Sequence, residues 1–191
     1  MILIIGLGNP GPEYAFTRHN AGFLALDTFA ESLNVLSFKF EKKFNAEISQ
    51  ITINGDTVIL AKPQTFMNSS GEAVQKLMQF YKIHPHNCWV IFDELDLPLG
   101  AIKIRKNGGS GTHNGLKSIV AMVGREFPRF RIGIESRGLS APEKQDTHSF
   151  VLTTFTKQEQ SVAKEVFKKT AESLHEALKN GLDSAMNKFN S

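Results

Sequence analysis

The sequence predicts a single α/β domain, residues 1–191, in which a twisted, mixed β-sheet is flanked by helices. Two observations favour this fold class. Short apolar runs typical of buried strands alternate along the chain with segments whose apolar residues recur every three or four positions, as on one face of a helix. The dipeptide Asn54-Gly55 separates two strand-like runs and is typical of a tight hairpin turn, so part of the sheet is antiparallel.

The first half of the chain is expected to form three strands and two helices. Residues 2–5 are an unbroken, β-branched-rich apolar run, which is typical of a strand buried on both faces. An amphipathic helix follows, because apolar residues recur at positions 23, 26, 30 and 33. Residues 48–53 and 57–61 are the two strands of the hairpin. Ser69 and Glu72 match the S-x-x-E capping box, which predicts a helix beginning immediately after Asn68.

The second half continues the alternation of strands and helices. Residues 89–92 are another buried apolar run, whereas residues 101–105 and 130–134 alternate between apolar and polar side chains, as half-exposed strands do. A helix is expected at residues 116–123. A longer one runs from a second capping box, Thr156 and Glu159, to a stop at Asn180-Gly181. Residues 136–147 are a polar excursion with no predicted element.

Composition narrows the class of protein. The chain carries 22 Lys and Arg against 19 Asp and Glu, but seven basic residues and one acidic residue lie between positions 101 and 131, which predicts a local basic surface. Cys88, the single cysteine, lies in an apolar run and is expected to be a buried, inert thiol in a reducing compartment. Because we find no targeting signal and no apolar run of membrane length, we expect a cytoplasmic protein without membrane contacts.

Several polar side chains follow predicted strands or precede a helix. Taken singly, each is more often a turn or cap residue. Together they are expected to share one cleft, because ligands of open α/β sheets bind at the carboxyl ends of the strands. His19 and Asp93 are the acid/base candidates, since a carboxylate fixes the tautomer of an imidazole that activates water. The other candidates are Asn9, Asn68, His113 and Asn114.

Three further motifs carry less weight. The glycines within residues 6–11 match G-x-G-x-x-G, but two prolines bracket the third glycine and prevent a helix from starting where a dinucleotide would need its N-terminus. Ser110 is not in a nucleophile elbow, because Thr112 replaces the second glycine of that motif. His84 and His86 have no third ligand nearby, so we expect no metal site.

The basic stretch adjoins the glycine loop before Asn114. Lys and Arg are usually solvated surface, but this charge imbalance beside the predicted cleft favours a phosphate-bearing ligand. Arg105 and Arg131, on the outward faces of two strands, are the best phosphate candidates. Tyr14 and Phe66 are candidates for stacking on a base or ribose, and packing of Phe66 under its own loop is the alternative.

Three long motifs resemble the bacterial-type peptidyl-tRNA hydrolase family. They are GLGNPGPEYAFTRHNAGF at residues 6–23, KPQTFMNSSG at residues 62–71, and DELDLPLG with GGSGTHNGLKSI within residues 93–119. The likeness covers nearly the whole chain. It implies a monomeric, cytoplasmic α/β enzyme of translation that needs no metal or other cofactor. Its partner is then tRNA, and its reaction is hydrolysis of the ester between a peptide and the 3′-terminal ribose.

The resemblance also implies roles for individual residues. His19 is expected to activate water with Asp93 as its partner, and Asn9 to help distinguish blocked from free aminoacyl groups. The implied substrate contacts are Asn68 and Asn114, with Tyr14, Phe66 and Met67 nearby, and the implied clamp for the tRNA 5′-phosphate is Arg105 and Arg131.

Two departures from the family pattern and two rival functions remain. Thr112 stands where the family usually has Gly, which would stiffen the glycine loop. The segment Glu135-Ser136-Arg137-Gly138 replaces a Gly-Arg-Pro-like turn, so the contacts that this turn makes in the family are not predicted here.

A non-catalytic RNA-binding module on this scaffold would leave the ester whole. A dinucleotide-dependent enzyme would bind a nicotinamide cofactor, which we do not expect.

Overall fold

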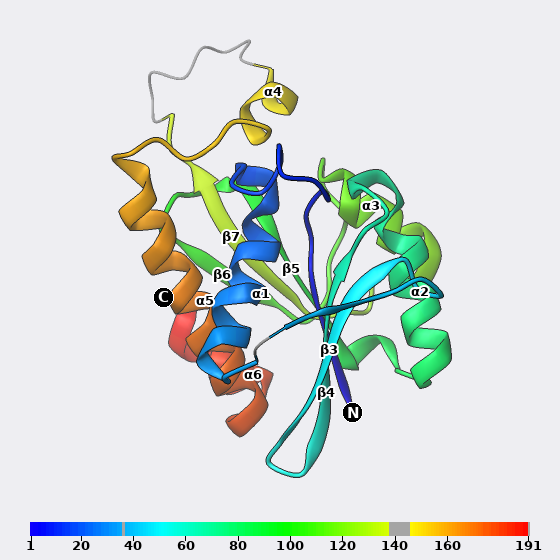
Figure 1. The fold of residues 1–191 in the computed structure, drawn as a ribbon. Helices are drawn as coiled ribbons and strands as arrows, with labels where there is room; N and C mark the ends of the chain where they lie inside the picture. The colour runs from blue at the N-terminus through cyan, green and yellow to red at the C-terminus, as the bar shows by residue number, and fades with distance from the viewer. Residues whose placement is uncertain (36, 138–145, 191) are drawn as a thin grey trace.

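A computed structural model describes residues 1–35, 37–137 and 146–190 of the chain. Within these ranges the chain forms a seven-stranded mixed sheet in the order β2-β3-β4-β1-β5-β7-β6, with helices on both faces (Figure 1). The fold class predicted from the sequence is confirmed. No helix of the described residues is long and apolar enough to cross a membrane.

The elements have the following bounds. The strands are β1 (Ile2–Gly6), β2 (Lys39–Glu41), β3 (Ala46–Ile53), β4 (Asp56–Pro63), β5 (Cys88–Pro98), β6 (Ile102–Arg105) and β7 (Arg129–Glu135). The α-helices are α1 (Ala21–Ser32), α2 (Ser70–Tyr81), α3 (Asn114–Val123), α4 (Thr147–Val151), α5 (Glu159–Asn180) and α6 (Leu182–Phe189). Short 3₁₀ turns are η1 (Arg18–Asn20), η2 (Met67–Ser69) and η3 (Pro85–Asn87).

The centre of the sheet is parallel and its edges are antiparallel. Strand β1 pairs in parallel with β4 on one side and β5 on the other, and β5 pairs in parallel with β7. The chain first crosses from β1 to β4 through α1 and then returns past β1 to β5 through α2. The carboxyl ends of β1, β4 and β5 therefore meet at a switch point of the sheet, where ligands of such folds bind.

Apolar clusters fill the space on both faces of the sheet. Ile4 and Ile91 pack with α1 and α5 on one face, and Leu3 and Phe92 pack with α2 and α3 on the other. Figure 1 shows α1, α5 and α6 on one side of the sheet and α2 and α3 on the opposite side. Successive side chains of β1 enter different clusters, which explains why its whole run is apolar.

The glycines of the first loop allow α1 to approach the sheet closely. A Cβ atom on Gly6 would lie 2.5 Å from the carbonyl oxygen of Gly22, and one on Gly8 would lie 2.7 Å from the ring of Phe23. A Cβ atom on Gly22 would lie 2.4 Å from the carbonyl oxygen of Ile91. Helix packing therefore accounts for the glycine pattern without a bound dinucleotide.

The hairpin and the C-terminal capping box form as predicted. Strands β3 and β4 are antiparallel around Asn54 and Gly55, whose φ angles of 52° and 85° suit the tight turn. The Thr156 backbone N–H donates to Glu159 Oε2 at 2.7 Å, and the Glu159 N–H donates to Thr156 Oγ1 at 3.3 Å. Cys88 is fully buried, and burial raises the pKa of its thiol to about 12, as expected of an inert cysteine.

Other local predictions need correction. The predicted capping box at Ser69 does not form, because the chain enters α2 through the η2 turn and the Ser69 side chain makes no cap bond. Asp93 lies within β5 rather than after it, because pairing with β7 continues past that residue. Strand β2 and helices α4 and α6 were not predicted from the sequence. Most of the predicted polar excursion, residues 138–145, lies outside the described residues.

Candidate active site

Two neighbouring cavities open at the switch point of the sheet. One, of about 100 Å³, is lined by residues of β5, α3 and α4, and the other, of about 320 Å³, by residues of the loops after β1 and β4. The second contains all the predicted substrate-binding residues, namely Asn9, Tyr14, Phe66, Met67, Asn68 and Asn114. Four residues line both cavities: His19, Asn114, His148 and Val151. These four mark the border between the two cavities.

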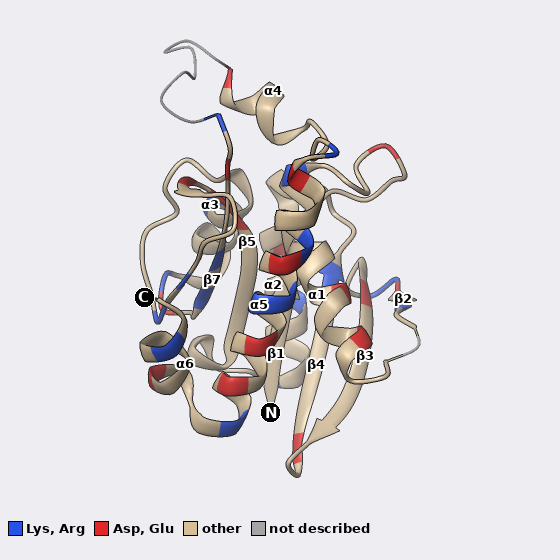
Figure 2. Cartoon of the chain, turned by 90° about the vertical axis from the view of Figure 1, so that its left-hand side faces the viewer, with Lys and Arg blue, Asp and Glu red and all other residues tan. Residues whose placement is uncertain are grey.

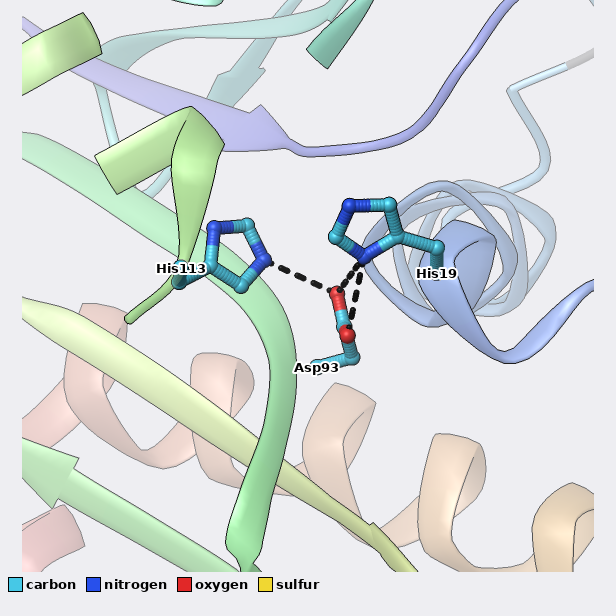
Figure 3. A group of neighbouring side chains, drawn as sticks. All are labelled: His19, Asp93 and His113. Carbon is cyan, nitrogen blue, oxygen red and sulfur yellow. Dashed lines mark hydrogen bonds and ion pairs between the residues drawn. The ribbon is translucent and has the colours of Figure 1, made fainter. Parts of the chain in front are cut away.

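His19 and Asp93 meet in this cleft, although 74 positions separate them in the sequence. His19 Nδ1 lies 2.9 Å from Asp93 Oδ1 and 3.0 Å from Oδ2. A second imidazole, His113, places its Nε2 atom 2.9 Å from the same Oδ1 (Figure 3). The predicted proximity of His19 and Asp93 is confirmed. The contact of His113 with Asp93 was not predicted.

The hydrogen bonds assign the tautomers of both imidazoles. The backbone N–H of Leu116 donates to His113 Nδ1 at 3.2 Å, so His113 must carry its proton on Nε2 in order to donate to Asp93. His19 Nδ1 is likewise the donor to the carboxylate. The Nε2 atom of neutral His19 therefore keeps a lone pair that can accept a proton from water.

Burial and charge act in opposite directions on this network. Burial favours the neutral form of Asp93, but the facing imidazoles and their hydrogen bonds outweigh it and hold the carboxyl pKa well below its usual range. Burial lowers the pKa of His19, but the charge of Asp93 and its hydrogen bond raise it overall above 6.5. Asp93 is 3% exposed and His19 is 9% exposed, so water screens the pair little.

Arg18 anchors the turn that carries His19. It is 3% exposed, and its Nη2 atom donates to both carboxylate oxygens of Glu159, at 2.8 and 2.6 Å. The guanidinium also donates to Thr153 Oγ1 at 2.7 Å and lies over the rings of Phe150 and Phe155, 4.6 and 5.1 Å from their centroids. Turn η1 is thereby fixed to the segment between α4 and α5.

Three hydrogen bonds hold Asn9 in place. Its Oδ1 atom accepts from the Met67 N–H at 2.8 Å, which leaves its amide NH₂ group available to the cavity. Asn20 holds the Asn9 backbone, because its Oδ1 accepts from the Asn9 N–H and its Nδ2 donates to the Asn9 carbonyl oxygen, both at 2.9 Å. Sequence reasoning missed Asn20, although it follows His19 directly in the TRHN motif.

Phe66 presents an exposed ring at the cavity mouth. Its φ angle of 57° is strained for an aromatic residue, and 55% of the residue is exposed. The alternative that Phe66 packs under its own loop is therefore wrong. Its ring stands edge-on to that of Tyr14, with 6.4 Å between centroids. Met67 is buried at 4% exposure, whereas Asn68 and Asn114 are exposed.

The basic residues of β6 and β7 share one face of the sheet, because Lys103 lies opposite Arg131 and Arg105 opposite Arg129. Figure 2 shows blue segments along β7. Arg105 and Arg131 line a cavity of about 420 Å³ together with the glycine loop. Arg105 is exposed, and Arg131 Nε lies 2.9 Å from Glu94 Oε2.

Arg129 is an exception to the predicted basic surface, because it is buried at 2% exposure. It donates to the carbonyl oxygens of Phe127 at 2.9 Å and Gly108 at 2.6 Å, and so supports the glycine loop from beneath. Its guanidinium therefore binds backbone carbonyl oxygens inside the protein and does not contribute to the basic surface.

The side chains of His19, Asp93 and His113 are of the types that bind zinc, and their potential ligand atoms lie within 4.8 Å of one another. The hydrogen bonds to Asp93 already account for their grouping. The absence of a metal remains a prediction. Among the described residues, neither cavity lining contains a serine or a cysteine, so a paired imidazole is the group best able to activate a nucleophile there.

Fold and site together define a hydrolase-type protein of α/β fold with a histidine–carboxylate network at the switch point of its sheet. The sequence model of the family described as "Peptidyl-tRNA hydrolase" matches residues 3–191. The chain belongs to the peptidyl-tRNA hydrolase family.

Individual relatives and solved structures agree with this family. The chain is 44% identical over 191 residues to the peptidyl-tRNA hydrolase of Alkaliphilus metalliredigens, covering 100% of both chains. It is 45% identical over 192 residues to that of Chloroflexus aurantiacus, covering 100% of this chain and 99% of the relative. The crystal structure of peptidyl-tRNA hydrolase from Acinetobacter baumannii superposes with a TM-score of 0.91 at 37% identity, covering 100% of this chain and 95% of that one.

Proposed function

We propose that this protein hydrolyses the ester that joins a peptide to the 3′-terminal ribose of tRNA. The observation that carries the proposal is the buried His19–Asp93 pair at the switch point of the sheet, in a chain that the family model matches over residues 3–191. An ester needs less assistance to its leaving group than an amide does. A water molecule activated by an imidazole is therefore a sufficient nucleophile.

In this mechanism His19 Nε2 takes a proton from water as the water oxygen attacks the ester carbonyl carbon. The buried carboxylate of Asp93 stabilises the imidazolium that forms and keeps Nδ1 as the donor. His113 holds the other side of Asp93 and acts as a positioning residue. The amide NH₂ groups of Asn9 and Asn114 line the cavity and are the proposed donors to the developing oxyanion.

The same cleft gives a physical basis for selecting blocked substrates. A peptidyl group presents an amide N–H next to the ester, whereas a free aminoacyl group presents an ammonium ion. Desolvating an ammonium without a counter-charge is costly, so amide side chains such as Asn9 and Asn68 disfavour the unblocked substrate. Among the described residues, the lining of the larger cavity contains no Asp or Glu that could pair with an ammonium ion.

For the tRNA itself we propose the basic face beside the glycine loop. Arg105 is exposed and free to bind a phosphate, whereas Arg131 would exchange part of its ion pair with Glu94 for the tRNA 5′-phosphate. A cytoplasmic location, a monomeric state and a catalytic domain spanning residues 1–191 are also part of the proposal. Analytical ultracentrifugation of the purified protein tests the monomeric state.

The deciding experiment is an ester-cleavage assay on N-blocked and unblocked aminoacyl-tRNA side by side. We expect rapid release of the blocked group and little cleavage of the free aminoacyl ester. A protein that binds the tRNA but leaves both esters whole is an RNA-binding module, and the proposal is then wrong. Saturable binding of a nicotinamide cofactor would instead favour the dinucleotide-dependent enzyme.

A further inference from the structure

A third imidazole, that of His148 on α4, faces the same cleft. His148 is exposed and lines both cavities together with His19. Its backbone N–H is bonded to Asp146 Oδ1 at 3.0 Å, but its ring has no hydrogen-bond or ion-pair partner among the described residues. His19 and His113, by contrast, are both bonded to Asp93. His148 is therefore the cleft imidazole with both ring nitrogens available to a substrate.

The residues that line the two cavities indicate where His148 would lie relative to a bound substrate. The larger cavity has the aromatic and amide side chains, and the smaller one has charged and hydroxyl groups such as Glu94 and Thr112. A substrate attacked by water at His19 must place its ester near the border between them. The residues shared by the two linings define that border, and His148 is one of the four. The acyl and ribose halves of the substrate then extend to opposite sides of it.

Helix α4 is fixed relative to His19. Asp146 caps the helix through the N–H groups of His148 and Ser149, at 3.0 and 3.3 Å. The Phe150 ring lies under the Arg18 guanidinium, 4.6 Å from its centroid, and Arg18 directly precedes His19. The contact that anchors the His19 turn therefore also holds α4 beside that turn.

We propose that His148 is a further catalytic residue, which donates a proton to the ribose oxygen that leaves when the ester breaks. This inference rests on the proposed hydrolysis. In the first step, the water oxygen bonds to the carbonyl carbon and His19 Nε2 takes the proton of the water. In the second, the bond from carbon to ribose oxygen breaks and that oxygen takes a proton from protonated His148. His19 and the carboxylic acid product release their protons to solvent, from which the exposed His148 is reprotonated.

Several charged or titratable groups surround His148 and enter any pH dependence. They are Asp146 on its own element, Arg18 and His19 on η1, Asp93 and Glu94 on β5, Tyr14 of the first loop, His113 before α3, and Arg137 after β7, whose guanidinium lies 4.4 Å from the Phe150 centroid. A change in the pH profile must therefore be compared with a control variant. His86 on η3 provides that control, because η3 precedes β5 and His86 lines neither of the two cavities.

The experiment compares wild type, His148→Gln, His148→Ala and His86→Gln in steady-state cleavage of N-blocked aminoacyl-tRNA from pH 5 to 9. We expect His148→Gln to lower kcat by about 10²-fold, near the lower end of the range for positioned proton transfer, with KM within about twofold of wild type. The pH profile of His148→Gln should differ from that of wild type. Added imidazole should restore part of the His148→Ala rate, and His86→Gln should match wild type.

Two results overturn the inference. One is a kcat for His148→Gln within about twofold of wild type, and the other is a lower kcat with an unchanged pH profile and no rescue by imidazole, which indicates a structural role only. If wild type cleaves the ester and His148→Gln cleaves it equally well, only the His148 inference fails. If wild type leaves the ester whole, the proposed function fails with it.

Discussion

Replacing Asp93 by asparagine separates the charge of this side chain from its shape. The carboxylate accepts from both imidazoles, at 2.9 Å from His113 Nε2 and at 2.9 and 3.0 Å from His19 Nδ1. An amide has one acceptor oxygen and one NH₂ donor, so one of the two oxygen positions that His19 Nδ1 faces becomes a donor. The Leu116 N–H holds His113 in its Nε2–H form. The amide oxygen must therefore take the Oδ1 position, which both imidazoles face, and the NH₂ group takes the Oδ2 position, 3.0 Å from His19 Nδ1.

The NH₂ group at the Oδ2 position then favours the wrong tautomer of His19, with Nδ1 accepting and the proton on Nε2. The general base is lost, and we expect kcat to fall by about 10⁴-fold, the scale seen when a His–Asp pair is disrupted in this way. That loss corresponds to about 5 kcal/mol of transition-state stabilisation. KM should change little, because among the described residues the side-chain hydrogen bonds of Asp93 are to His19 and His113 and to none of the amide side chains that line the larger cavity.

Adding His113→Ala tests the cause of that loss. Without the second imidazole, the amide introduced by Asp93→Asn can rotate, so that its oxygen accepts from His19 Nδ1 and its NH₂ group binds water. The double variant should then be about tenfold faster than Asp93→Asn alone, a gain of ~1.4 kcal/mol. Single-turnover kinetics measure the rates, and ¹⁵N NMR of His19 reports its tautomer. A single variant within tenfold of wild type, or a double variant no faster than the single, refutes the reasoning.

Three further predictions concern the pH dependence, the anchoring ion pair and the basic clamp. The folded pKa of His19 lies above its unfolded value of 6.5. As pH rises through the folded pKa, kcat should increase, because neutral His19 is the base, and the stabilisation from this group, fully present below pH 6.5, should be lost. A pH series of kcat and of urea unfolding checks both trends. Arg18→Met removes the ion-pair partner of Glu159 and should lower the free energy of unfolding by about 3 kcal/mol, measured by urea denaturation. A loss below about 1 kcal/mol would mean that the ion pair does not anchor the turn. Arg105→Ala and Arg131→Ala should each raise KM and flatten its dependence on salt, and an unchanged salt slope would contradict the clamp.

The regular part of the fold was predictable because local patterns determine it. The apolar run of β1 requires burial on both faces, and Asn54-Gly55 favours a hairpin whatever surrounds it. Elements whose formation depends on tertiary contacts were missed or misplaced. The capping box at Ser69 has the right residues, but the η2 turn required by the Met67 contact with Asn9 displaces it.

The candidate site was predictable only in part, for a similar reason. The ends of strands and the family motifs indicate His19 and Asp93, and the structure brings them within hydrogen-bond distance. The second bond from His113 to Asp93 and the ion pair between Arg18 and Glu159 join residues 20 and 141 positions apart. No local periodicity encodes such contacts, because they depend on how the strands and helices are packed.

The central claim is that His19 removes a proton from water at the ester. The most direct test is the His19→Ala variant at saturating enzyme, with cleavage of N-blocked aminoacyl-tRNA and affinity for that tRNA measured on the same preparation. We predict a loss of about 10²- to 10⁴-fold in the cleavage rate, the range for general base catalysis, with the affinity within about threefold of wild type. A variant that releases the peptide at a near-normal rate would contradict the claim.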